Sequence, residues 1–264
     1  MLSLNRLVLA SLALSAAAQA VAQTEPVPLL AQTIHLDAPV VAAAGKRACT
    51  LQVRSFGDAE NLTYLQAGYA AGLGCGWESA LRISAAELKS YALAGGAAIR
   101  HGGSDIELVA RRQPWEGKSI VLQAGIAQPR TPARGKPCFT LGASAGWTPG
   151  ADLALTLNPK AVILKENALV GVGMGLAARV GSAWTLIADC TPLVTGDNTR
   201  SAIDGGKIRR TTYGAALRYN AREFGDGVTV DLGWTNGLGS STGTSLTPGL
   251  GDAKALYVAV TARR

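Results

Sequence analysis

Hydrophobic and polar residues alternate along most of the chain after its first 45 residues. The clearest stretch runs from Leu169 to Val180, where one set of alternate positions holds Val, Met, Leu and Ala. The other set holds glycines, one Ala and Arg179. A helix would mix the two sets, whereas a β-strand points successive side chains to opposite faces. The pattern therefore predicts a strand with one apolar face and one face of small or polar residues.

The same alternation predicts about twelve strands in all. Most are close to the ~9–11 residues that a tilted strand needs to cross a bilayer. In the fourth strand, Gly102 and Gly103 either bend one long strand or split it into two. The predicted strands are 48–55, 62–71, 77–84, 97–111, 119–128, 138–147, 151–158, 169–180, 183–191, 211–221, 227–236 and 254–263.

The connections between the predicted strands alternate in length. Those that follow even-numbered strands are short, whereas those that follow odd-numbered strands include the long segments 85–96, 192–210 and 237–253. Membrane barrels have tight periplasmic turns at one rim and longer surface loops at the other, and an even number of strands. A soluble sandwich with Greek-key connections gives no reason for such alternation. We therefore predict an all-β chain folded as a single antiparallel transmembrane β-barrel.

The composition agrees with a wall that faces lipid. Hydrophobic residues make up 48% of the chain and charged residues only 16%, against about 25% charged residues in a typical soluble domain. Six aromatic residues fall near predicted strand ends, as in the aromatic girdles of barrels. They are Trp77, Trp115, Trp147, Trp184, Trp234 and Tyr213.

The N-terminus has the features of a signal peptide. Arg6 precedes an apolar run, 7–18, and small residues follow at the spacing that signal peptidase prefers, within 18–22. We predict a signal peptide over 1–22, a periplasmic lead segment over 23–47, and an outer-membrane barrel over 48–264. His35, in the predicted lead segment, has no acidic neighbour in the sequence and receives no role.

Three groups of segments resemble YjbH-like and related bacterial outer-membrane barrels. The resemblance implies an outer-membrane β-barrel and a link to export of surface polysaccharide. Such barrels usually end in an aromatic residue that the barrel-insertion machinery reads, whereas this chain ends in two arginines. The similar segments are 61–69 with 76–82, 157–161 with 188–198, and 231–240.

Charged residues of both signs lie on the polar faces of the predicted strands. A barrel of this size has a narrow lumen, and an isolated buried charge costs several kcal/mol, so these groups must pair or keep water. They form either a slightly basic channel or a cross-braced lumen that blocks flow, while glycines such as Gly173 and Gly214 favour some open space. The predicted lumen-facing charges are Arg82, Glu107, Arg111, Arg179, Asp189, Arg218 and Asp231.

Other chemistry finds little support in the sequence. His101 and Ser104 would fall on opposite faces of a strand, so we predict no enzyme activity. The four cysteines form two disulfides, in one of three pairings, or stay unpaired. They lack metal-ligand spacing and only two histidines exist, so we predict no metal and no cofactor.

The net charge is +7, but the basic residues are scattered along the chain and have no aromatic neighbours. We therefore predict no nucleic-acid partner. The predicted partners are outer-membrane lipid, lipopolysaccharide phosphates and the insertion machinery. The sequence favours a narrow channel for small solutes or an accessory to surface-polysaccharide export. The alternatives are a non-conducting barrel with a structural or loop-binding role and a soluble exported β-sandwich or lipocalin-like carrier.

Overall fold

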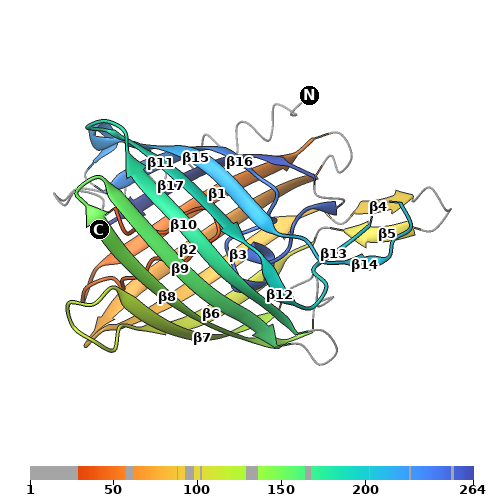
Figure 1. Cartoon of the computed structure of the whole chain (residues 1–264), viewed down its shortest axis with the longest axis horizontal. Helices are drawn as coiled ribbons and strands as arrows, with labels where there is room; N and C mark the ends of the chain where they lie inside the picture. The colour runs from red at the N-terminus through yellow and green to blue at the C-terminus, as the bar shows by residue number, and fades with distance from the viewer. Residues whose placement is uncertain are drawn as a thin grey trace.

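The protein folds as a closed antiparallel β-barrel (Figure 1). In this computed structural model the described residues are 29–57, 62–87, 89–92, 98–101, 103–128, 136–163, 168–201, 203–225, 227–250 and 253–264. The predicted signal peptide lies outside them. Within these ranges twelve strands form the wall: β1 (Arg47–Phe56), β2 (Leu62–Gly74), β3 (Trp77–Ala86), β6 (Asp105–Arg112), β7 (Ile120–Gln128), β8 (Cys138–Gly150), β9 (Leu153–Ile163), β10 (Leu169–Arg179), β11 (Trp184–Thr191), β15 (Thr212–Asn220), β16 (Val228–Thr235) and β17 (Ala255–Arg263).

Each wall strand pairs with the next one along the chain, and β17 pairs with β1 to close the barrel. The first and last strands run side by side from Ala48↔Arg263 to Phe56↔Ala255. Closure removes the two open edges that a flat sheet would expose. The predicted all-β transmembrane barrel of about twelve strands is confirmed.

The predicted fourth strand splits in two. β6 joins the wall, whereas β5 (Ala98–His101) pairs with β4 (Lys89–Ala92) in a hairpin outside it. The chain changes direction at Gly103, whose φ of 104° suits glycine. The backbone groups of Gly103 bond to Ala86, so the β3–β6 pairing ends there and the hairpin begins.

The two rims of the barrel differ in the length of the connections between strands. The short turns and the C-terminus lie at one rim, and the long connections lie at the other, where the β4–β5 hairpin and the hairpin of β13 (Thr199–Arg200) with β14 (Lys207–Ile208) project beyond the wall (Figure 1). We call these the short-turn rim and the long-loop rim. In outer-membrane barrels they correspond to the periplasmic and outer sides.

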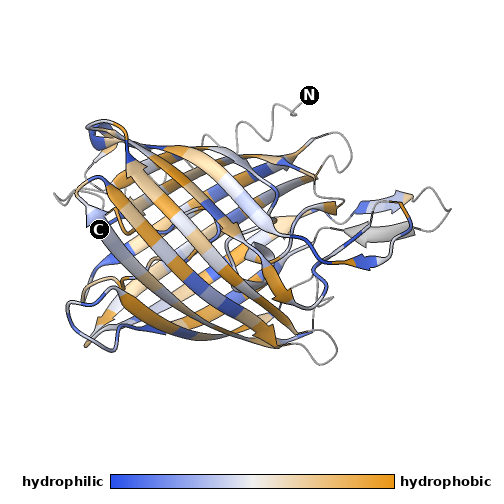
Figure 2. Ribbon diagram, in the orientation of Figure 1, coloured by the Kyte–Doolittle hydropathy of each residue, from blue (hydrophilic) through white to orange (hydrophobic). Residues whose placement is uncertain are grey.

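Alternate residues of the strands cover the outside of the barrel with apolar side chains. Orange and blue positions alternate along the wall in Figure 2. Large apolar side chains are exposed on the outer face, such as Leu108 at 52% and Leu232 at 56%. Exposed Trp77, Trp147 and Trp184 mark the short-turn rim and Trp234 the long-loop rim. An apolar band between aromatic girdles is the surface that lipid requires.

The lead segment is not where the sequence placed it. Residues 29–42 lie inside the barrel, where Ile34, His35 and Leu36 are at most 1% exposed, and Ala43 and Ala44 are exposed at the short-turn rim. The sequence analysis placed this segment in the periplasm, as part of a lead segment over 23–47, of which residues 23–28 lie outside the described residues. The segment has no alternation because it forms no strand: its side chains and backbone groups bond to the inside of the wall instead of to a neighbouring strand.

The four cysteines, all within the described residues, are unpaired, which agrees with the second of the two alternatives. Cys49 and Cys75 are exposed and Cys138 is buried. In the described ranges no helix is long and apolar enough to span a membrane.

The apolar outer face of the wall can be tested in lipid. We expect Leu232→Arg to lower the free energy of unfolding by roughly 2–4 kcal/mol, because a charge near the bilayer midplane is costly on the lipid face. The measurement is denaturant unfolding in phospholipid vesicles. Ile203→Arg, at a position 76% exposed in the long connection, is the control and should change it by less than about 0.5 kcal/mol. Equal effects of the two substitutions would contradict a lipid-facing wall at Leu232.

Candidate functional site in the barrel lumen

Two segments enter the lumen from opposite rims. The first is residues 29–42, which we call the plug. It is held at the short-turn rim by the pairing of Gly45 with Gly72. The second is residues 236–250, between β16 and β17, which we call the constriction loop and which contains the short helix α2 (Thr242–Ser245). All four residues of α2 are buried. The interior of the barrel is therefore largely occupied by the chain itself.

The plug has an apolar side that fits glycines of the wall. A Cβ at Gly173 would lie 2.4 Å from Leu36 Cδ2, and a Cβ at Gly214 would lie 3.0 Å from Ile34 Cδ1. The glycines on the inner face of β10 thus provide the space into which Leu36 packs. Ile34 also belongs to a buried cluster with small residues of β9, β10 and β15. The sequence analysis took these glycines to favour open space in the lumen, whereas in the structure side chains of the plug fill the space beside them.

His35 joins the tip of the plug to two strands. Its Nδ1 lies 2.6 Å from Asp189 Oδ1 on β11, and its Nε2 lies 2.7 Å from Thr235 Oγ1 on β16. Asp189 also accepts hydrogen bonds from Thr33 Oγ1 and from the backbone N–H of His35. Burial lowers the pKa of His35 more than Asp189 raises it. A neutral ring that carries its proton on Nδ1 donates to Asp189, and its Nε2 faces the Thr235 hydroxyl.

Asp37 forms the second contact between the plug and the wall. Its carboxylate forms an ion pair with Arg82 of β3 and accepts a hydrogen bond from Gln123 Nε2 of β7 at 2.9 Å. Ser144 Oγ donates to the carbonyl of Asp37 at 2.8 Å. Burial alone would raise the pKa of Asp37, but Arg82, Arg111, Lys160 and the bond from Gln123 lower it to about 2. Asp37 is therefore a charged anchor at neutral pH.

Other basic side chains of the wall bind carbonyl groups of the plug. Arg218 Nη2 donates to Gln32, and Arg111 donates to Ala38. Each also pairs with an acidic neighbour in the wall, Arg218 with Asp231 at 2.7 Å and Arg111 with Glu78. A buried charge needs a partner and further hydrogen bonds, and the wall and the plug supply both.

The plug and the constriction loop meet near the tip of the plug. Arg54, which is fully buried, donates to the carbonyls of Ile34 and Gly237 at 3.0 and 2.9 Å. Lys160 Nζ donates to the carbonyl of His35 at 2.7 Å and to Ser245 Oγ at 2.8 Å. Two wall cations therefore hold both inserted segments at once.

Two acidic residues of β6 bind the constriction loop directly. Ser241 Oγ donates to Asp105 Oδ2 at 2.5 Å, and the backbone N–H of Thr242 donates to Glu107 Oε2 at 2.9 Å. Glu107 also forms an ion pair with Arg82 at 3.1 Å. The charged network thus runs from the loop through Glu107 and Arg82 to the plug at Asp37.

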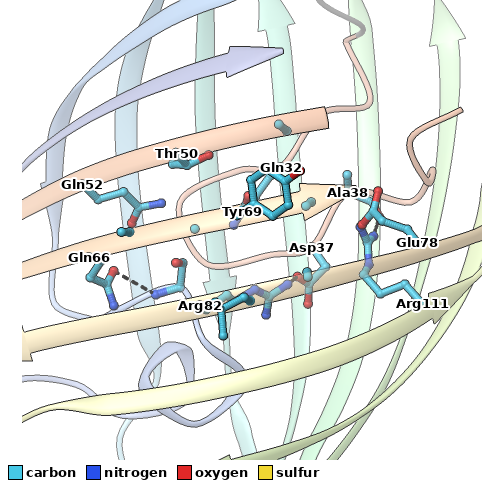
Figure 3. Close-up of a pocket in the computed structure, with 17 residues that line it drawn as sticks. Gln32, Asp37, Ala38, Thr50, Gln52, Gln66, Tyr69, Glu78, Arg82 and Arg111 are labelled. Atoms are coloured by element: carbon cyan, nitrogen blue, oxygen red, sulfur yellow. Dashed lines mark hydrogen bonds and ion pairs between the residues drawn. The ribbon is translucent and has the colours of Figure 1, made fainter. Parts of the chain in front are cut away.

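A cavity of about 70 Å³ remains between the plug and the wall of β1–β3 and β6. Figure 3 shows the glutamines and the ion pairs that surround it. It has room for a few water molecules. The residues labelled in Figure 3 that line it are Gln32, Asp37, Ala38, Thr50, Gln52, Gln66, Tyr69, Glu78, Arg82 and Arg111.

The seven charges predicted to face the lumen do not all lie in this network. Arg179 is 42% exposed at the short-turn rim and lies 3.3 Å from Asp152, which is also exposed. The other six are buried or nearly so and have partners inside the barrel: Arg82, Glu107, Arg111, Asp189, Arg218 and Asp231.

Sequence reasoning missed several members of the network. His35 and Asp37 were missed because their segment showed no alternation, and the acidic partner of His35 is 154 positions away. Lys160 was missed because the strand predicted over 151–158 continues past Pro159, as β9, to Ile163. Arg54 shares the inner face of β1 with Gln52, so alternation within that strand was a usable signal.

Comparisons with known proteins agree with this fold. No family model and no curated protein sequence matches the chain. Among solved structures, the NanC porin matches with a TM-score of 0.53 at 8% identity, covering 82% of this chain and 98% of that one. The KdgM porin matches with a TM-score of 0.50 and the same identity and coverage.

Together with the apolar outer belt, these likenesses define the class: the protein is an outer-membrane β-barrel with a porin-like fold. The resemblance to YjbH-like barrels is supported only at this level. The closed sheet excludes the soluble β-sandwich, and the many large apolar side chains exposed on the outer face do not fit a soluble lipocalin-like carrier.

The glycines under the plug generate a test of its docking. We expect Gly173→Leu to displace Leu36 and weaken plug docking by roughly 1–3 kcal/mol, the usual cost of overpacking. The measurement is hydrogen exchange of the amides of residues 33–42. Gly68→Leu is the matched control, because a Cβ there meets only Thr50 Cβ, at 3.8 Å. Unchanged protection in Gly173→Leu would show that Leu36 does not pack there.

The pKa of Asp37 generates a test of the plug in acid. Its value is about 2 in the plugged barrel and 3.8 ordinarily, so the released state binds protons more readily. The stabilisation, roughly 2 kcal/mol, is complete above pH 3.8 and is lost as the pH falls towards 2. Plug amides, corrected for intrinsic exchange rates, should lose protection over this range. In Asp37→Asn this component should be absent, and an identical acid response in the variant would refute the assignment to Asp37.

Proposed function

We propose that the protein is an outer-membrane channel for small polar solutes whose lumen the plug closes. The observation that supports this proposal most is the way the plug is bound. Its anchors are polar and charged groups of the wall, and its apolar side chains rest on glycines. If the plug withdraws, the wall left behind is polar and lined by small residues, as a water-filled path requires.

A non-conducting barrel is the alternative, because the same network also braces the wall. Three strong pairs lie wholly within the wall: Arg218–Asp231, Arg111–Glu78 and Arg82–Glu107. These pairs do not need the plug to be satisfied. The wall is therefore able to keep these three pairs after the plug leaves, and this favours a channel over a permanently filled barrel.

The predicted signal peptide, membrane insertion and link to polysaccharide export also belong to this proposal. Residues 1–22 would direct export, and the insertion machinery would place the barrel among lipid and lipopolysaccharide. A link to surface-polysaccharide export rests on the YjbH-like segments. A polymer would require both the plug and the constriction loop to leave, so small solutes fit the lumen better. We propose no catalytic role: the Thr235–His35–Asp189 contacts are buried and serve to hold the plug.

Conductance tests the proposal directly. In planar bilayers we expect the full chain to be closed most of the time, and a variant lacking residues 29–42 to conduct in steady steps, because the lumen is then open beside the constriction loop. Heat-modifiable migration and far-ultraviolet circular dichroism would establish that the variant keeps its barrel. Leu36→Asp, which places a charge against the glycines of β10, should raise the open fraction in the full-length chain. A folded deletion variant that passes no current would reject the channel in favour of the non-conducting barrel.

A further inference from the structure

The carboxylate of Asp37 is bound in the way that a receptor binds a carboxylate ligand. One oxygen pairs with the Arg82 guanidinium, and the other accepts a hydrogen bond from Gln123 Nε2 at 2.9 Å. The two donors come from β3 and β7, which lie on either side of β6 in the wall. Hydrogen bonds between charged groups are stronger than neutral ones, and an arginine suits a planar carboxylate.

The Asp37 carboxylate lies among basic side chains of the wall. Arg82, Arg111 and Lys160 all act on its carboxylate. Two wall carboxylates, Glu107 and Glu78, pair with the two arginines. Lys160 has Asp37 and the wall residue Asp189 among its acidic neighbours. A departing plug would therefore leave Arg82 and Lys160 with one carboxylate fewer in the lumen.

The wall around Asp37 also offers neutral polar groups. Ser144 Oγ donates to the Asp37 carbonyl, and the Asp37 N–H donates to Asn158 Oδ1 at 3.3 Å. The 70 Å³ cavity reaches Asp37 and extends towards Gln52 and Gln66 (Figure 3). Hydroxyl groups of a solute would find both donors and acceptors here.

We propose that Arg82 and Gln123 form a binding site for the carboxylate of a small hydroxylated monoanion in the open lumen, and that Asp37 occupies this site in the closed form. The inference rests on the proposed channel and specifies its solute class. The plug then acts as a built-in competitor: it closes the lumen by placing its own carboxylate where that of the solute binds.

The first experiment empties the site in the full-length chain. Asp37→Ala removes the carboxylate and leaves Arg82 and Gln123 facing a vacant position. We expect millimolar acetate to restore hydrogen-exchange protection to plug amides in this variant, and acetamide of the same shape to restore none. In Asp37→Ala combined with Arg82→Gln the effect of acetate should weaken about tenfold or more, as the loss of a charge-assisted bond implies.

Asp152→Ala is the matched control, because it removes an acidic residue at the exposed rim, and acetate should not alter its plug protection. Equal effects of acetate and acetamide on Asp37→Ala would overturn the carboxylate site. This experiment needs no conductance, so its failure is separate from a failure of the channel.

The second experiment tests the solute class in Asp37→Ala, reconstituted at full length in planar bilayers. Glucuronate should interrupt the current at concentrations at least about tenfold lower than glucose, which has the same ring without the carboxylate. Arg112→Gln, an outward arginine over Trp77, is the control for a general loss of positive charge, and combining it with Asp37→Ala should leave the preference intact. Current without any preference for glucuronate would reject the solute class and keep the channel.

Discussion

Charges inside a closed, lipid-embedded wall must have partners, and the rest of this structure follows from that constraint. Alternation places every second residue of twelve strands in a narrow interior, and the remaining residues face lipid. The inner positions carry arginines, a lysine and several carboxylates. Isolated, each would cost several kcal/mol. The wall pairs some of them across neighbouring strands, as in Arg218–Asp231, and satisfies others with groups of the inserted segments.

One side of the plug provides partners for the charges of the wall, and its other side packs against glycines of the wall. Its carbonyls and Asp37 bond to wall cations, whereas Ile34 and Leu36 rest on positions where the wall has glycine. The constriction loop is bound by the same cations from the opposite rim, since Arg54 and Lys160 contact both segments. Closure of the lumen is therefore cooperative: the loss of one segment leaves Arg54 and Lys160 with fewer partners and weakens the hold on the other.

The wall was predictable from the sequence, and its contents were not. Period-two alternation and the alternating lengths of connections located the strands, because both follow from local geometry. The fourth strand was ambiguous, since Gly102 and Gly103 permit either a bend or a break. Asp189 and Arg218 could be assigned to the inner face by alternation alone. The plug could not be found this way, because an irregular segment has no period and its partners, such as Asp189 for His35, are distant in sequence. The glycines of β10 indicated open space, but their pattern does not tell what fills it.

The closed lumen requires residues 29–42 to lie inside the barrel, and methyl-resolved NMR of the intact protein in lipid nanodiscs tests this most directly. We expect strong nuclear Overhauser effects from the Leu36 methyl groups to the α protons of Gly173 and Gly175, and from the Ile34 methyls to Gly214. Leu36 and Ile34 methyls that show contacts only with water, while the barrel strands retain their own cross-strand contacts, would contradict it.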